Sequence, residues 1–196
     1  MAELTLEQKE RFFKNQEKVG KVIINHVKKK GLILFGQKAT NRQLPEDLRK
    51  DTQDYDIFSA TPKKSAKRIE RKLDKKFEGD FFIVREAIHG GTYKVISKIG
   101  DKGVADIGKP DRKVPTVTRK GVKLATLEFQ KKQIKKSLAD PDSKFRHPKD
   151  KEVRSRIRIA EQRKRERKVK TPKRKRTPRN LKFNLPQFKL STKVDF

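Results

Sequence analysis

Two aspartates separated by a single residue are the first feature of this sequence that could do chemistry. Asp54 and Asp56 lie in the run DYDIF at 54–58, where charged and apolar residues alternate. Such alternation predicts a β-strand with both carboxylates on one face, about 7 Å apart. Carboxylates at that spacing can share divalent cations with a triphosphate, because Mg²⁺ prefers one or two carboxylates plus substrate oxygens. A solvated strand face is the simpler explanation of such a pair in a basic protein.

A third carboxylate and a glycine extend the candidate site. Asp106 lies in the short apolar run VADI at 104–107, and a carboxylate on a neighbouring strand would complete a two-metal site. Upstream, the apolar run LILF at 32–35 ends at Gly36, where a backbone turn could present amide groups to a phosphate. The order of these features along the chain, more than any one of them, favours a phosphate-handling site.

The elements that must position these residues follow from periodicity and turn signals. Apolar residues at helical spacing predict a helix over 4–30, which ends at Gly31 after three lysines. A second, strongly basic amphipathic helix is predicted over 62–77. We expect the other elements to be a strand at 32–35, a helical turn and loop over 37–53, strands at 54–58, 81–84, 92–97 and 104–107, and a helix over 122–138.

Composition points to a polyanionic partner. The 196 residues hold 55 Lys plus Arg against 25 Asp plus Glu, a formal charge of +30. Such a charge destabilises a compact state by self-repulsion unless counter-charge is at hand. Nucleic acid supplies that counter-charge, and an anionic membrane surface could also supply it. The absence of cysteine excludes disulfides and thiolate metal sites.

The amino-terminal sequence and the lack of long apolar runs predict an intracellular protein. Acidic and polar residues interrupt the start of the chain, so it does not read as a signal peptide. No apolar run approaches the length needed to span a membrane.

The last quarter of the chain differs from the rest. Residues 146–196 hold 20 Lys or Arg and 5 Asp or Glu, so their net charge of +15 equals that of residues 1–145. Two prolines within 171–180 prevent a continuous helix, and so polar a segment cannot bury a core by itself. We therefore expect an amino-terminal helix over 1–30, a domain over 31–145, and a basic tail over 146–196 that is extended or ordered by a partner protein or neighbouring subunit.

A series of short motifs then points to a known family. They are Gly36, Ala39, Asn41, Leu44-Pro45, Asp54-Tyr55-Asp56, Phe58-Ser59, Ala87, His89, Gly91-Thr92-Tyr93 and Ala105-Asp106-Ile107. In this order they resemble the active-site region of the nucleotidyltransferase superfamily, and more closely the poly(A) polymerase-like proteins of large DNA viruses. The resemblance covers about residues 30–150 and ends near the run FRHPKD at 145–150.

The resemblance implies a polymerase-β-like nucleotidyltransferase fold of the α+β class, a mixed sheet with flanking helices, followed here by the basic tail. It implies that Asp54, Asp56 and Asp106 are catalytic metal ligands for Mg²⁺ or Mn²⁺. It also implies that Gly36, Gln37, Lys38 and Asn41 bind the phosphates of an NTP. The reaction would transfer a nucleotidyl group to an acceptor hydroxyl on RNA or DNA. A viral protein of the host cytoplasm or the virion is the corresponding expectation.

Basic residues outside this site are candidates for nucleic-acid binding. Phosphate contacts would come from Lys63, Lys64, Lys67, Arg68, Arg163, Lys164, Arg165, Lys173, Arg174, Lys175 and Arg176. One position departs from the family pattern, because Gln37 stands where the family has its second glycine. The alternative is therefore a catalytically degenerate protein, a nucleic-acid-binding structural component of a virion or nucleoprotein assembly.

Overall fold

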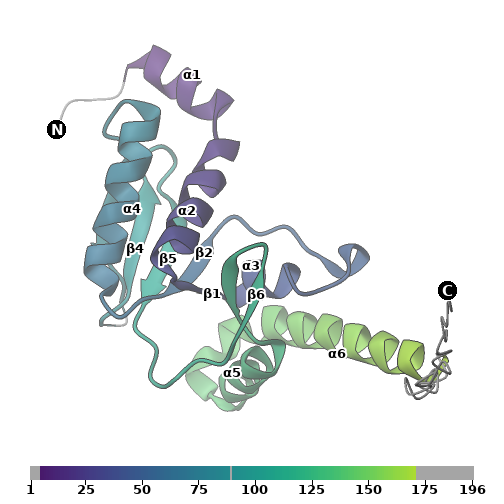
Figure 1. Ribbon diagram of the computed structural model, residues 1–196. Coiled ribbons are helices and arrows are strands. Elements are labelled where there is room, and N and C mark those ends of the chain that lie inside the picture. Colours follow the sequence, from purple (N-terminus) through teal and green to yellow (C-terminus); the bar gives the residue numbers. More distant parts are fainter. Residues whose placement is uncertain (1–4, 89, 171–196) are drawn as a thin grey trace, which may run out of the picture.

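A mixed seven-stranded sheet with flanking helices forms the body of the protein (Figure 1). The computed structural model describes residues 5–88 and 90–170. The strands are β1 (Ile33–Phe35), β2 (Tyr55–Phe58), β3 (Phe82–Glu86), β4 (Tyr93–Ser97), β5 (Lys102–Gly108), β6 (Thr116–Arg119) and β7 (Val122–Ala125). The helices are α1 (Leu6–Lys14), α2 (Glu17–Lys30), α3 (Gly36–Asn41), α4 (Pro62–Phe77), α5 (Leu127–Ala139) and α6 (His147–Lys170), with 3₁₀ turns η1 (Glu46–Leu48) and η2 (Pro141–Arg146).

The strand order is β3-β4-β5-β2-β1-β7-β6. At its centre, β2 runs antiparallel to β1 and parallel to β5, while β1 runs parallel to β7. The α+β class expected from the sequence, with a mixed sheet and flanking helices, is confirmed.

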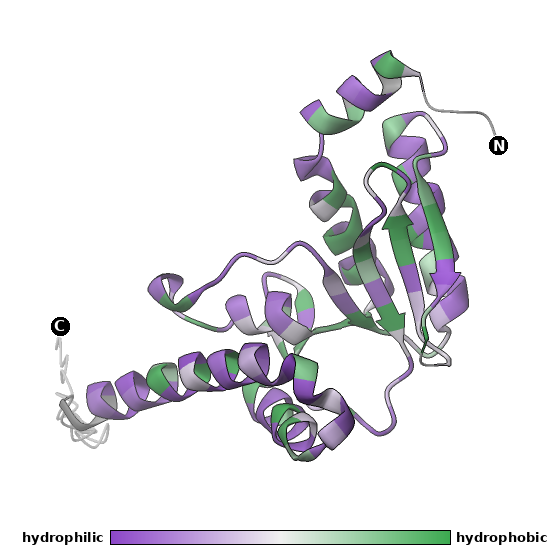
Figure 2. Ribbon diagram, turned by 180° about the vertical axis from the view of Figure 1, so that it is seen from behind, coloured by the Kyte–Doolittle hydropathy of each residue, from purple (hydrophilic) through white to green (hydrophobic). Residues whose placement is uncertain are grey.

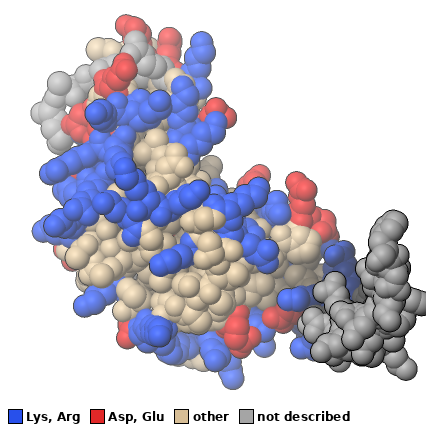
Figure 3. Space-filling view, in the orientation of Figure 1, with Lys and Arg blue, Asp and Glu red and all other residues tan. Residues whose placement is uncertain are grey.

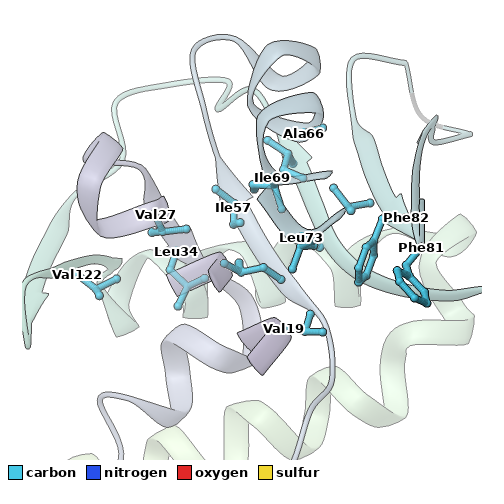
Figure 4. Packing of buried hydrophobic residues seen from close by; sticks show 14 of the residues in the cluster. Val19, Val27, Leu34, Ile57, Ala66, Ile69, Leu73, Phe81, Phe82 and Val122 are labelled. Atoms are coloured by element: carbon cyan, nitrogen blue, oxygen red, sulfur yellow. The ribbon is translucent and has the colours of Figure 1, made fainter. Parts of the chain in front are cut away.

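The two faces of the sheet have different environments because side chains alternate along each strand. On one face, Leu34, Ile57 and Ile107 are fully buried beneath α2 and α4, together with apolar residues of those helices (Figure 4). On the other face, Phe35 and Phe58 stack with their ring centroids 3.8 Å apart, and Phe129 of α5 covers them. The remainder of this second face carries the polar residues of the candidate site.

The expected single helix over 4–30 is wrong, because two helices meet at Asn15 and Gln16. The break lets α1 turn Phe12 into a cluster of aromatic rings at the end of the core. Its ring centroid lies 5.2 Å from that of Phe77 and 5.5 Å from that of Phe81. The burial of these large rings offsets the loss of the hydrogen bonds that a continuous helix would have made at the break.

The expected helix over 122–138 is wrong in its first five residues, because α5 begins only at Leu127. Val122 and Leu124 are buried and Lys123 is exposed, which is the period of a strand. They belong to β7, which pairs with β6 in a hairpin and adds to β1. The helix α5 begins after Thr126, whose hydroxyl caps it by accepting from the Phe129 N–H at 3.3 Å.

Part of the segment expected as the basic tail folds as α6. This helix is largely hydrophilic (Figure 2), yet Val153 and Ile157 are buried against Leu44 and Ile134. Residues 171–196, which include the remainder of the expected tail, lie outside the described residues, and the domain boundaries stay a prediction. None of the described helices is long and apolar enough to cross a membrane.

Candidate active site

The register of the central strands brings two of the predicted aspartates side by side. Asp56 of β2 and Asp106 of β5 are direct partners in the parallel pairing, so their side chains share one face. On the next strand, β4, Lys94 pairs with Asp106 and places its Nζ 3.6 Å from the Asp106 Oδ2. Asp54 lies just before β2, two residues from Asp56, so alternation directs it to the same side.

Burial and mutual repulsion disfavour negative charge on this cluster. Loss of solvation, followed by the charges of Asp54 and Asp106, raises the pKa of Asp56 to about 7. Lys149 and Arg146 oppose that rise. Burial also raises the pKa of Asp106, against the attraction of Lys94. A cation placed among these carboxylates would relieve the repulsion that shifts their pKa values.

Gly36 lies directly against the cluster. It connects β1 to α3 with φ at +63°, a conformation that favours glycine. A Cβ at this position would lie 1.9 Å from the Asp56 Oδ2, so even alanine would collide with the carboxylate. The glycine predicted to form a phosphate-binding turn is therefore also required for the position of Asp56.

Two further residues of the predicted phosphate-binding segment lie beside the chain that leads to Asp54. Gln37 is buried and its Nε2 donates to the Lys50 carbonyl oxygen at 3.5 Å, so its amide points toward the loop at 42–54. The Lys38 Nζ lies 4.9 Å from the ring centroid of Tyr55. Burial lowers the pKa of Lys38, while Asp51 and Asp54 oppose this.

Asn41 braces the same loop, with help from α6. Its side chain donates to the Lys50 carbonyl oxygen and accepts from the Lys50 N–H at 3.2 Å. The buried Arg156 donates through Nη1 to the Asn41 Oδ1 at 3.2 Å and to the Leu48 carbonyl oxygen at 3.1 Å. Sequence reasoning missed Arg156, because one arginine in a helix rich in basic residues carries no local signal of burial.

An open hollow of about 390 Å³ lies over the acidic cluster. It is lined by Gln53, Asp54, Lys94, Lys102, Gly103 and Asp106. Sequence reasoning also missed Lys94 and Lys102. Lys94 could have been found, because it lies within the strand predicted at 92–97. The hollow therefore combines carboxylates with lysines that could pair with phosphate oxygens.

The predicted nucleic-acid-binding residues do not lie at this cluster. Lys63, Lys64, Lys67 and Arg68 are on α4, which packs on the opposite face of the sheet. Arg163, Lys164 and Arg165 are exposed on α6, where Arg163 pairs with Asp47. Lys173, Arg174, Lys175 and Arg176 lie outside the described residues.

The donor set suits a hard divalent cation that also binds substrate. Among the described residues, no group of three or more His, Asp or Glu side chains stands close enough to hold a metal by itself. Mg²⁺, however, takes one or two carboxylates and completes its shell with phosphate oxygens and water. The paired Asp56 and Asp106, whose charge is disfavoured without a cation, fit that pattern. Asp54 as a third ligand stays a prediction.

The fold is similar to that of solved structures. The crystal structure of the Megavirus polyadenylate synthase matches 78% of this chain with a TM-score of 0.65 at 17% sequence identity. This chain spans 32% of that protein. The crystal structure of JHP933 from Helicobacter pylori matches 72% of this chain and 61% of its own, with a TM-score of 0.40 at 15% identity. No protein-family model and no curated protein matches the sequence. The expected nucleotidyltransferase-like fold is confirmed.

Proposed function

We propose that this chain is a Mg²⁺-dependent nucleotidyltransferase that acts on nucleic-acid ends. The observation that carries the proposal is the direct pairing of Asp56 with Asp106, beside Gly36, within a nucleotidyltransferase-like fold. An open acidic hollow flanked by lysines suits a triphosphate better than it suits a neutral substrate.

Each residue group then has a role. Asp54, Asp56 and Asp106 would hold Mg²⁺ or Mn²⁺, which when bound lowers the pKa of an acceptor hydroxyl and stabilises the leaving pyrophosphate. The acceptor oxygen bonds to the α-phosphorus of an NTP, the bond from that phosphorus to the bridging oxygen breaks, and pyrophosphate leaves. The hydroxyl proton passes to a carboxylate of the cluster. The segment from Gly36 through Gln37 and Lys38 to Asn41 lies beside the triphosphate.

Incorporation of labelled nucleotide tests the proposal. Because the Megavirus protein is named a polyadenylate synthase, ATP is the first nucleotide to try, followed by the other NTPs. The full chain, with Mg²⁺ or Mn²⁺, should extend RNA or DNA oligonucleotides that have a free 3′-hydroxyl. The variant Asp54→Asn plus Asp56→Asn should lose this activity, whereas Asp111→Asn plus Asp142→Asn, at exposed positions, should keep it. Equal incorporation by the Asp54/Asp56 variant would exclude the proposed site.

A catalytically degenerate nucleic-acid-binding component is the second candidate. The ion pair of Lys94 with Asp106 favours it, because it occupies a carboxylate that catalysis would need. Gln37 at the position of the family's second glycine points the same way. On this reading the chain would bind RNA or DNA in a virion or nucleoprotein assembly of a virus-infected cell. RNA binding by the wild-type chain without incorporation of any NTP would favour this candidate.

A further inference from the structure

The helices α2 and α4, which cover the face of the sheet opposite the aspartates, present a surface of positive charge. Figure 3 shows Lys and Arg side chains gathered over α2 and α4. Eight cations of α4 are exposed, namely Lys63, Lys64, Lys67, Arg68, Arg71, Lys72, Lys75 and Lys76. This surface lies on the face of the sheet opposite Asp56, because the neighbouring Ile57 is buried beneath the same helices.

The acidic residues of α4 are turned inward. Glu70 is buried and accepts from the Val84 N–H at 3.1 Å. Asp74 accepts from the Phe81 and Phe82 N–H groups at 2.9 and 3.0 Å. Both carboxylates are thus used to hold the start of β3, and among the exposed α4 cations only Lys67 has an ion pair within the described residues, with Glu70. The outer row of the helix, Lys64, Arg68, Arg71 and Lys75, is left for an outside partner.

The surface continues across α2 to the hairpin of β6 and β7. Lys28, Lys29 and Lys30 are exposed in the last turn of α2. The Lys28 side chain lies against Gly121 of the hairpin, where a Cβ would come within 2.5 Å of the Lys28 Cε. Basic residues of α2 and α4 therefore meet on one side of the molecule, and the β6–β7 hairpin borders them at Gly121.

Beneath this surface lies a buried histidine with cations as neighbours. His26 of α2 is buried, and its Nε2 makes no hydrogen bond within the described residues. Burial, followed by the charges of Lys72, Lys30 and Arg68, lowers the pKa of His26. The cations of α2 and α4 are therefore close enough together to repel a further positive charge.

We infer that this basic surface of α2 and α4 binds the phosphate backbone of nucleic acid, on the face of the sheet opposite the aspartates. Residues three or four apart on a helix are about 5–6 Å apart, so the outer row of α4 offers a closely spaced line of cations. Such contacts carry no base specificity, and they anchor the strand by releasing condensed counterions. The surface binds whether or not the aspartates catalyse, because the two faces are separate.

An anionic membrane is the other polyanion that the charge could suit, and the surface lacks what that partner needs. Helices that lie on membranes insert an apolar face among the lipids, whereas the apolar stripe of α4 is buried on the sheet. In the described part of the chain, the exposed large apolar side chains are Leu6, Phe13, Ile88, Phe145 and Ile159, and none of them lies on this surface.

The test compares two variants that each remove four exposed positive charges. The first carries Lys64→Gln, Arg68→Gln, Arg71→Gln and Lys75→Gln, and the control carries Lys132→Gln, Lys135→Gln, Lys136→Gln and Arg154→Gln. Binding of a fluorescent 20-nucleotide RNA is measured from 50 to 300 mM NaCl. If all four side chains contact phosphates, the slope of log K against log salt should fall by about 3 in the first variant, with at least tenfold weaker binding at 100 mM NaCl. The control variant should change much less.

Two other measurements keep the inference falsifiable if the first variant folds poorly. RNA should protect Lys64 and Lys75 of the wild-type chain from an amine-labelling reagent, and should leave Lys132 and Lys135 labelled. The variant Asp54→Asn plus Asp56→Asn should bind RNA as the wild type does, which separates this inference from the proposed catalysis. Equal losses in the two four-charge variants would overturn it. Binding to phosphatidylserine vesicles in place of RNA would also overturn it.

Discussion

At the scale of single residues, the Asp56 carboxylate that is proposed to bind the metal also destabilises the metal-free fold when it is charged. Its pKa is raised to about 7, so the folded chain holds a proton that the unfolded chain releases near pH 3.8. Between these values the unfolded state binds fewer protons, and stability therefore falls as the pH rises. Above pH 7 the full cost is present, and at about 1.4 kcal/mol per pKa unit it amounts to roughly 4 kcal/mol.

Replacing Asp56 by Asn should stabilise the metal-free protein at neutral pH. Asn has a similar shape and no charge, so it relieves both the loss of solvation and the repulsion by Asp54 and Asp106. In urea unfolding, the free-energy difference from wild type should be small at pH 4 and reach about 2 kcal/mol or more at pH 8. Added Mg²⁺ should stabilise the wild type more than the variant. A difference that does not change with pH would contradict this account.

The lack of room for a Cβ at Gly36 leads to a second prediction about a single residue. In Gly36→Ala, a Cβ would meet the Asp56 carboxylate and the positive φ would be strained, so we expect a loss of at least about 1–2 kcal/mol in stability. Mg²⁺ binding, measured by calorimetry, should weaken as Asp56 is displaced. Gly90→Ala is the matched control, because a Cβ there meets no atom within 4 Å. Wild-type stability and Mg²⁺ affinity in Gly36→Ala would show that Asp56 can move without consequence.

At the scale of elements, the sequence predicts the strands of the site better than it predicts their pairing. Alternation in DYDIF and the apolar run VADI indicate β2 and β5, and Gly36 indicates the turn between β1 and α3. Their adjacency depends on β5 pairing with β2 across the intervening α4, β3 and β4, which no local pattern reveals. The same limit hid β7, because its four residues continue without a break into the helical pattern of α5.

The contacts of Arg156 with Asn41 and Leu48 also join distant parts of the chain, so no local pattern reveals them. They lead to a prediction about the loop at 42–54. In Arg156→Met the helix keeps an apolar side chain of similar length but loses the donors to Asn41 and Leu48. Hydrogen bonds from a charged group contribute about 1.5–3 kcal/mol, so local opening should become roughly 10–100 times more frequent. Hydrogen exchange at the Lys50 amide, which donates to Asn41, reports this opening.

The control for that experiment is Arg154→Met, at an exposed position of the same helix. It should leave exchange at Lys50 unchanged, and both variants should leave exchange in β4 and β5 unchanged. Equal protection of Lys50 in Arg156→Met and wild type would mean that the contacts of Asn41 and Gln37 hold the loop without Arg156.

At the scale of the whole molecule, positive charge predominates, but the two faces of the sheet differ in the charges that they carry. The acidic cluster lies on one face of the sheet, and the exposed cations of α2 and α4 lie over the other. Exposed ion pairs, such as Lys21 with Glu17, contribute little to stability. The formal charge of +30 therefore acts mainly as repulsion that folding must overcome.

This balance predicts that salt stabilises the protein. Raising NaCl from about 10 to 150 mM shortens the Debye length from about 30 to 8 Å, which screens repulsion between cations on neighbouring elements. A gain of about 1–2 kcal/mol would raise the melting temperature by several degrees in a chain of this size. The variant with four charges removed from α4 should start from a higher melting temperature at low salt and gain less from added NaCl. A melting temperature that falls with salt would mean that ion pairs outweigh repulsion. If the basic surface binds RNA, added RNA at equal ionic strength should raise the melting temperature further. A ligand that binds only the folded state adds its binding free energy to the stability of that state.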